Sequence, residues 1–389
     1  PVLLSMLVLV FERHGQQAAA AKRAGQKAKA DLPSTRMELY KIATRSAITK
    51  SLTQKRENGK SSEEIDDSSE AEYSKEIDLA DKMLSHVAVA NMEAQLREFD
   101  VGHVKKVLTP FSDEYELWER LQKEGKLPLI KVLTDGDAIE KAQFQFTHLS
   151  FQEAYFAQHI EENVDWPGWT TDDAATSFTN IRFHENTCRI GGDELGIELA
   201  SRRPSWDLSS GSDTSNRLHC HVLAGAAQKL TCLKGVGFQF EGDDARALTT
   251  KVISAITNSP TLVELGFRGL TRADVRQVEL GLKAGLKVNC ELKRLDMGEN
   301  QEGASGLLMA CKAGSVELCK SLIQASAEVN TSDQHGTTPL MAACGIGIFK
   351  ICDALIQAGA QKLADVRYDG ASALALSIMS KNRRCIASL

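Results

Sequence analysis

The sequence Gly336-Thr337-Thr338-Pro339-Leu340-Met341-Ala342-Ala343 decides the fold of the C-terminal region, because it opens the second of two copies of one pattern. The copies are Gly303–Ala327 and Gly336–Ala360, which lie 33 residues apart and share eleven identical positions. A fixed period of this length is typical of a solenoid of helix pairs, in which each unit buries its apolar faces only against its neighbours. The repeat therefore predicts a binding surface rather than an active site.

Each copy carries start and stop signals for helices. Pro339 suits the first turn of a helix, where its missing N–H costs nothing, and Gly347 ends that helix. Gly359 suits the left-handed C-cap of the second helix. A third copy begins at Gly370, at an offset of 34, but Lys381 stands where the earlier copies have a glycine. The sequence thus predicts two full helix pairs and a weaker, poorly stable third.

The pattern resembles the ankyrin repeat, whose units open with G-x-TPLHxAA, although Met341 replaces the histidine. The resemblance covers about a quarter of the chain and implies protein binding through the loop tips and the concave helical face. Aromatic and arginine side chains are favoured anchors of interfaces, which places Arg367 and Tyr368 first. We predict partner contacts at two tips, with ordinary solvated turn residues as the alternative: Asp333, Gln334, His335, Arg367, Tyr368 and Asp369.

Length and composition limit the remaining possibilities. A chain of 389 residues is long enough for two or three domains. Its formal net charge of −6 argues against nucleic-acid binding, because neutralising phosphates requires clustered Lys and Arg. The nine cysteines show no C-x-x-C spacing, which favours free thiols in a reducing, cytoplasmic compartment. Four of them occupy equivalent repeat positions where we expect burial: Cys311, Cys319, Cys344 and Cys352.

Two short motifs are too incomplete to predict a ligand site. The string His219-Cys220-His221 follows His184 and Cys188, but adjacent residues cannot easily converge on one tetrahedral ion. The string Gly59-Lys60-Ser61 matches only the tail of a P-loop, since its leading glycine is absent. We therefore expect no metal site and no phosphate cradle in this chain.

The start of the chain predicts a buried helix rather than a membrane span. Val2–Phe11 is apolar, but it has about half the length that a bilayer requires. It also lacks the basic start and the cleavage pattern of a signal peptide. Because the first residue is Pro1 and not Met, the simplest interpretation is a fragment that begins inside a domain.

Apolar spacing predicts helices over residues 31–50, 77–99, 111–124 and 127–139. Residues 144–157 begin with the alternation of a short strand and continue with helical spacing. Between the first two helices, residues 53–74 are polar and charged, which is typical of a disordered surface insertion.

Three strings in the N-terminal part resemble NACHT-type signalling ATPases: Pro1–Leu7, Leu32–Tyr40 and Phe146–Glu153. In that family the strings belong to the helical and winged-helix domains that follow the nucleotide-binding core. The resemblance implies that residues 1–36 end a helical domain. It also implies a winged-helix-like domain at residues 37–160, with the polar insertion at 53–74.

The same resemblance carries two residues over to nucleotide contact. His148 matches the histidine that contacts the phosphate of bound ADP, and an imidazole donor beside a phosphate is physically sound. Pro1 matches the proline that packs on the adenine. The alternatives are a core histidine that caps the strand-to-helix junction and a proline that starts a helix. Without Walker A and Walker B segments, the chain itself is not expected to hydrolyse ATP, so ADP or ATP is implied only if a core lies upstream.

Leucine spacing changes between the N-terminal part and the repeats. Leu292–Asn300 fits L-x-x-L-x-L-x-x-N with one Met, and Leu262–Phe267 fits its first half. The pattern resembles leucine-rich repeats and implies such a segment at 226–300, with a helical connector at 161–225 and ankyrin-like repeats at 301–389. Two short strands in a mixed helical domain are the alternative.

Taken together, the sequence predicts a mainly α protein with a winged-helix-like region, a short leucine-rich α/β segment and a C-terminal ankyrin solenoid. Two functions remain open. The chain is the regulatory, partner-binding portion of a NACHT-like switch, or it is a plain ankyrin scaffold with no nucleotide role. Both imply a protein partner and allow self-association, and neither makes this chain an enzyme.

Overall fold

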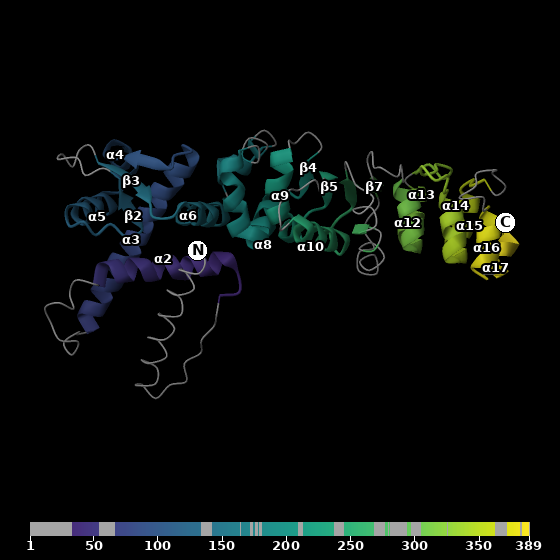
Figure 1. Cartoon of the computed structure of the whole chain (residues 1–389), viewed down its shortest axis with the longest axis horizontal. Helices are drawn as coiled ribbons and strands as arrows, with labels where there is room; N and C mark the ends of the chain where they lie inside the picture. Colours follow the sequence, from purple (N-terminus) through teal and green to yellow (C-terminus); the bar gives the residue numbers. More distant parts are fainter. Residues whose placement is uncertain are drawn as a thin grey trace, which may run out of the picture. The chain divides into compact units, whose positions relative to one another are not determined.

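A computed structural model describes residues 33–53, 67–133, 142–163, 165–171, 174–175, 178, 181–208, 213–236, 245–267, 277–278, 280, 294–296, 305–324, 326–361, 372–381 and 383–388 (Figure 1). The chain divides into two compact units. The first comprises Pro1–Val164 and Asn186–Gly191, and the second comprises Asp165–Glu185 and Gly192–Leu389.

The first unit combines helices with a three-stranded antiparallel sheet of order β1-β3-β2. Its described elements, in chain order, are α2 (Arg36–Thr53), α3 (Asp67–Glu93), β1 (Glu98–Asp100), α4 (Val101–Leu108), α5 (Ser112–Lys123), β2 (Ile130–Val132), β3 (Gln143–Phe146) and α6 (Leu149–Glu162).

Aromatic side chains fill the core between the sheet and the helices of this unit. Phe144 and Phe146 point inward from β3, and the ring of Phe144 meets Trp118 of α5 edge to face at 5.4 Å. Such edge-to-face pairs add to the energy of apolar burial. Asp100 joins β1 to α4, because its side chain caps the helix by accepting a 2.7 Å hydrogen bond from the His103 amide.

The second unit begins with a parallel sheet whose strands lie in chain order, β4-β5-β6-β7. Its described elements are η2 (Pro167–Trp169), η3 (Arg182–His184), α8 (Glu185–Arg202), β4 (Ser205–Asp207), α9 (Asp213–Ala226), β5 (Cys232–Val236), α10 (Ala245–Thr257), β6 (Glu264–Phe267) and β7 (Arg294–Asp296). Helix α8 spans the boundary of the two units, and Gly192 interrupts its helical geometry with φ 53°.

The parallel strands repeat one local arrangement. Trp206, Leu233 and Leu265 are paired across the sheet and buried. Before β5, the Thr231 hydroxyl donates to the carbonyl of Pro204, which precedes β4, at 3.2 Å. Before β6, the Thr261 hydroxyl donates to the carbonyl of Leu230, which precedes β5, at 2.7 Å. The residues that enter β5 and β6 are therefore each hydrogen-bonded to the turn before the previous strand.

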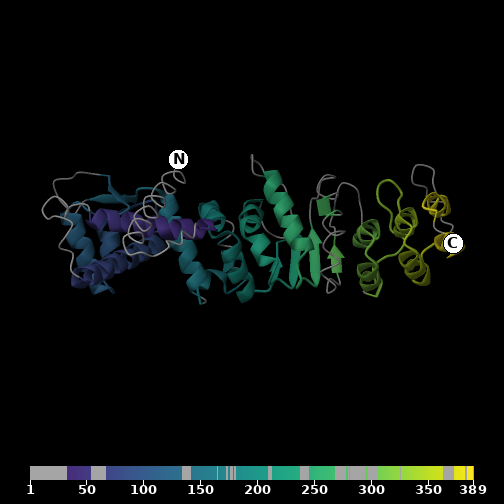
Figure 2. The ribbon, with the colours of Figure 1, turned by 90° about the horizontal axis from the view of Figure 1, so that it is seen from below.

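The C-terminal part of this unit consists of helix pairs that stack in two rows (Figure 2). The first helices of the pairs contact one another in the order α12 (Gly306–Ala313), α14 (Pro339–Ile346) and α16 (Ala373–Met379). The second helices do the same in the order α13 (Val316–Gln324), α15 (Phe349–Gln357) and α17 (Arg383–Ser388).

Several predicted elements are confirmed. Helices α2 and α5 cover most of the predicted helices at 31–50 and 111–124, and β3 followed by α6 is the predicted strand and helix. Strands also occur at the two leucine-rich stretches, as β6 and β7. The helix expected at Val2–Phe11 lies outside the described residues, as does most of the segment between β6 and β7.

Three predictions were wrong in part. The predicted helix at 127–139 contains strand β2, because Ile130 pairs with Phe146 of β3, a contact that local spacing does not reveal. The predicted helix at 77–99 ends at Glu93, and Phe99 lies in β1. Of the insertion predicted at 53–74, residues 67–74 belong to α3. In the described part of the chain, no helix is both long enough and apolar enough to cross a bilayer.

Candidate functional site

The loop before α14 carries the predicted contact residues that lie within the described part of the C-terminal region. Helix α14 starts where predicted: the Thr338 side chain accepts a 3.3 Å hydrogen bond from the Met341 amide, and Pro339 occupies the first turn. It ends at Gly347, whose φ of 77° lies in the left-handed region. The Thr338 cap therefore defines where the preceding loop enters the helix.

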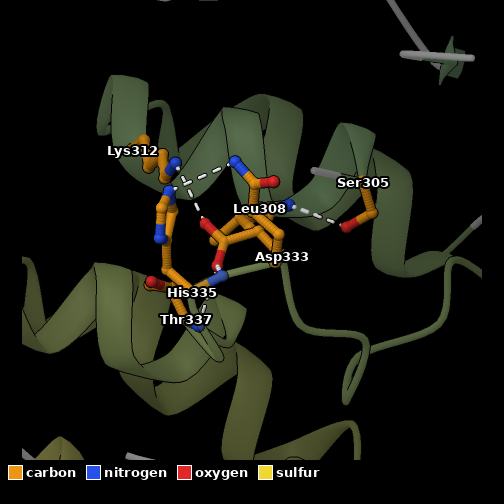
Figure 3. A network of polar contacts seen from close by, with 7 residues as sticks. Ser305, Leu308, Lys312, Asp333, His335 and Thr337 are labelled. Atoms are coloured by element: carbon orange, nitrogen blue, oxygen red, sulfur yellow. Dashed lines mark hydrogen bonds and ion pairs between the residues drawn. The ribbon is translucent and has the colours of Figure 1, made fainter. Parts of the chain in front are cut away.

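Asp333 organises this loop from the inside (Figure 3). Its side chain is 1% exposed, and one carboxylate oxygen accepts hydrogen bonds from the amides of His335 at 3.0 Å and Thr337 at 2.9 Å. The loop also closes through its backbone, since the Asp333 amide donates to the Thr337 carbonyl at 3.1 Å. Gly336 follows with φ 75°, a conformation that favours glycine.

Lys312 reaches the same carboxylate from the preceding repeat. Its ammonium lies 3.4 Å from the second oxygen of Asp333, so the charge on this buried acid is paired. Lys312 belongs to α12, and Figure 3 shows its side chain extending to Asp333 in the loop before α14. Pairing compensates the desolvation of a buried charge, and here it also ties the loop of one repeat to the helix of another.

Two of the predicted contact residues stand on the outside of this loop. Gln334 and His335 are both exposed, and their side-chain nitrogens lie 3.3 Å apart, Nε2 to Nε2. An amide and an imidazole offer donors and acceptors, and the imidazole tautomer decides which role each ring nitrogen takes. The loop thus presents two polar side chains from a backbone that Asp333 holds in one conformation.

The role of Asp333 in the structure differs from the predicted one. Sequence reasoning placed it among the residues that touch a partner, but its carboxylate is turned inward and is used by the loop and by Lys312. The other predicted tip, Arg367, Tyr368 and Asp369, lies outside the described residues. Lys312 was missed, because the second copy has Gly345 at the equivalent position and the repeat alignment alone gives no signal for it.

Of the two predicted nucleotide residues, His148 lies in the described part of the first unit. His148 is exposed and is the N-cap residue of α6, although its side chain makes no capping hydrogen bond. Its ring centroid lies 6.1 Å from that of Phe151. The alternative role, a core histidine that caps the strand-to-helix junction, is therefore wrong about burial and side-chain capping, although His148 does lie at that junction. Pro1 lies outside the described residues.

Two of the residues considered as metal ligands, His184 and Cys220, are buried in apolar surroundings. His184 is buried against Phe178, and desolvation lowers its pKa to about 4. Burial also raises the pKa of Cys220 far above its usual range. Across the described ranges, no three His, Cys, Asp or Glu side chains gather where they could hold a metal ion.

Comparison with protein families agrees with the geometry of the C-terminal region. A family model described as "Ankyrin repeats (3 copies)" matches residues 287–389. A comparison with curated proteins finds no match. The start of the matched region precedes the boundary predicted at residue 301 by 14 residues, from 301 − 287. The C-terminal region of this chain consists of ankyrin repeats, which are protein-interaction units.

Proposed function

We propose that this chain is a non-enzymatic binding protein whose ankyrin repeats hold a protein partner through the loop before α14, with Gln334 and His335 in contact. The observation that carries the proposal is the bracing of this loop by Asp333 and Lys312. A loop that is already ordered loses little conformational entropy on binding, which favours affinity. The two exposed side chains then supply specificity through hydrogen bonds.

The experiment compares proteins retained by the purified chain with those retained by two variants. The double variant Gln334→Ala with His335→Ala should lose the partner, since it removes both polar side chains. It leaves the loop intact, because the backbone amides of His335 and Thr337 still donate to the Asp333 carboxylate. Lys350→Ala is the matched control, because Lys350 is exposed on the second helix of the same repeat. A partner retained equally by all three proteins contradicts the proposed contact.

A regulatory portion of a NACHT-like switch is the second candidate, and the element order of the first unit favours it. The described order is helix, strand, two helices and two strands, with the sheet order β1-β3-β2. This order is typical of a winged helix. His148 stands exposed at the start of α6, where a nucleotide phosphate would find both an imidazole and a helix N-terminus.

The coding sequence upstream of Pro1 distinguishes the two candidates. A P-loop followed by an acidic strand there supports the switch, and His148→Ala in the longer protein should then weaken ADP binding measured by calorimetry. A wild-type affinity in that variant, or an upstream sequence with no such core, leaves the scaffold. Changes in Gln334 and His335 test the partner contact separately.

Three narrower proposals accompany these functions. The parallel strands β5, β6 and β7, of which β5 and β6 are entered from similar turns, favour leucine-rich-repeat-like units at residues 226–300. The exposed side of α5 favours a protein rather than a nucleic-acid ligand, since Glu116, Glu119 and Glu124 line a depression of about 370 Å³ together with Arg120 and Lys123.

We also propose a cytoplasmic location. Analytical ultracentrifugation of the purified chain tests for self-association.

A further inference from the structure

Five buried cysteines run through the ankyrin region and place their sulfur atoms in contact. The sulfurs of Cys311 and Cys319 lie 3.7 Å apart within the first repeat, and those of Cys344 and Cys352 lie 3.8 Å apart within the second. Cys352 also approaches Cys385 of α17 at 3.5 Å, the shortest of the three separations. None of these five cysteines forms a disulfide in the structure.

The helix pair that carries Cys385 is less well buried than the two before it. Leu374 and Ile378 of α16 are 42% and 56% exposed, whereas Leu340 and Cys344, which hold the equivalent positions of α14, are 1% and 0% exposed. Less buried apolar surface means a smaller free energy of local opening. Among the described helix pairs of this chain, the pair that carries Cys385 therefore has less apolar burial to oppose its opening.

We propose that a peroxide converts Cys352 and Cys385 into an intramolecular disulfide that joins α15 to α17 and locks the last helix pair closed. This inference goes beyond partner binding and does not depend on it. Two independent observations carry it: the 3.5 Å separation of the two sulfurs and the weak burial of the helix pair to which Cys385 belongs. The other close pairs lie in repeats whose helices are covered on both sides.

The chemistry balances in two steps. The Cys385 thiolate attacks one peroxide oxygen, so that an S–O bond forms, the O–O bond breaks and the departing hydroxide takes up a proton to give water. The sulfur of Cys352 then attacks the sulfenic sulfur, so that the S–S bond forms, the S–OH bond breaks and a second water leaves with the Cys352 proton. Two thiols lose two electrons in total, and hydrogen peroxide is reduced to two waters.

Burial sets the order of events. Desolvation raises the pKa of the Cys385 thiol to about 12, and a hydrogen bond with Cys344 raises the pKa of Cys352 still further. Since the thiolate is the reactive form, both groups react slowly while the repeat is closed. Opening of α17 returns Cys385 to water and to its ordinary reactivity, and closing brings the oxidised sulfur back to Cys352.

The test treats the full chain with hydrogen peroxide and maps its disulfides by mass spectrometry without reduction. We expect a linked peptide pair containing Cys352 and Cys385, with a mass lower by two hydrogen atoms, to form before any link between Cys311 and Cys319. The variant Cys385→Ser should form no such link in the last repeat, and Cys311→Ser, the matched control, should form it at the wild-type rate.

A second readout measures the lock itself. Trypsin cleavage after Lys381 and Arg383 should become roughly tenfold slower or more once the link forms, and a reducing agent should restore the original rate. Three results overturn the proposal: a first link between Cys344 and Cys352, equal rates of linkage in the first and last repeats, or oxidation of Cys385 to a sulfinic acid with no link. Because the wild-type map decides these outcomes, the proposal stays testable even if a variant fails to fold.

Discussion

Replacing Asp333 tests whether the loop before α14 is held by its buried carboxylate. Asp333→Ala removes an acceptor that two backbone amides and one ammonium share. The Thr337 amide belongs to a buried residue and would be left without this partner, which costs about 1–3 kcal/mol. The charge-assisted hydrogen bond from the His335 amide is lost as well. Together these losses should lower the free energy of unfolding of this repeat by about 3 kcal/mol.

Asp333→Asn separates hydrogen bonding from charge. Its amide oxygen can still accept from the two backbone amides, so only the ion pair with Lys312 and part of the bond strength are lost, about 1 kcal/mol. Urea unfolding followed by circular dichroism measures both losses, and hydrogen exchange at the Thr337 amide reports the loop itself. Asp353→Ala is the control, because the Asp353 carboxylate accepts an exposed hydrogen bond from Gln357 on the same helix. Equal losses for Ala and Asn, or a loss below about 0.5 kcal/mol for Ala, would refute the reasoning.

Three further predictions follow from backbone geometry and burial. Ser326 and Lys381 adopt φ 64° and 55°, so changing each to Gly should raise the free energy of unfolding by about 0.5–1 kcal/mol in urea titrations. Gly196→Ala should destabilise the second unit by about 3 kcal/mol or more, because an added Cβ would lie 1.9 Å from the Val222 carbonyl oxygen. His184 has a folded pKa of about 4, below its unfolded value of 6.5, so its contribution to stability is fully present above pH 6.5 and is lost progressively as pH falls from 6.5 to 4. We expect a loss of about 2 kcal/mol between pH 7 and pH 5, which His184→Phe should abolish.

Controls accompany the glycine predictions. Gly345→Ala places its Cβ in open space on α14, so it should leave stability unchanged or raise it by up to about 1 kcal/mol. Gly359→Ala should instead destabilise, because Gly359 has φ 91°. A gain for Gly359→Ala, or a loss for Ser326→Gly, would contradict the conformational argument.

The helix pairs of the ankyrin region could be predicted because each local signal agrees with the repeat. Thr338, Pro339 and Gly347 act as cap residues at the predicted ends of α14. The missing glycine of the third copy was also informative, since Lys381 is forced into a left-handed conformation. Because local sequence determines such caps, they can be predicted without a structure.

Features that depend on distant contacts could not be predicted. Strand β2 exists because it pairs with β3, whereas the apolar spacing of its sequence predicted a helix. The ion pair of Asp333 with Lys312 joins residues that are 21 positions apart and in different repeats, so local sequence gives no sign of it. The contact of Cys352 with Cys385 depends on the stacking of α15 and α17, and the third copy matches the other two too weakly to reveal it.

Site-specific photo-crosslinking tests the central claim most directly, the claim that the loop before α14 touches a protein partner. A photoreactive p-benzoylphenylalanine is placed at position 334 of the chain and, as a control, at position 350 on α15, the second helix of the same repeat. We predict that irradiation in cells captures one protein from position 334 and not from position 350, and that His335→Ala reduces this capture. The same set of captured proteins from both positions would contradict the account.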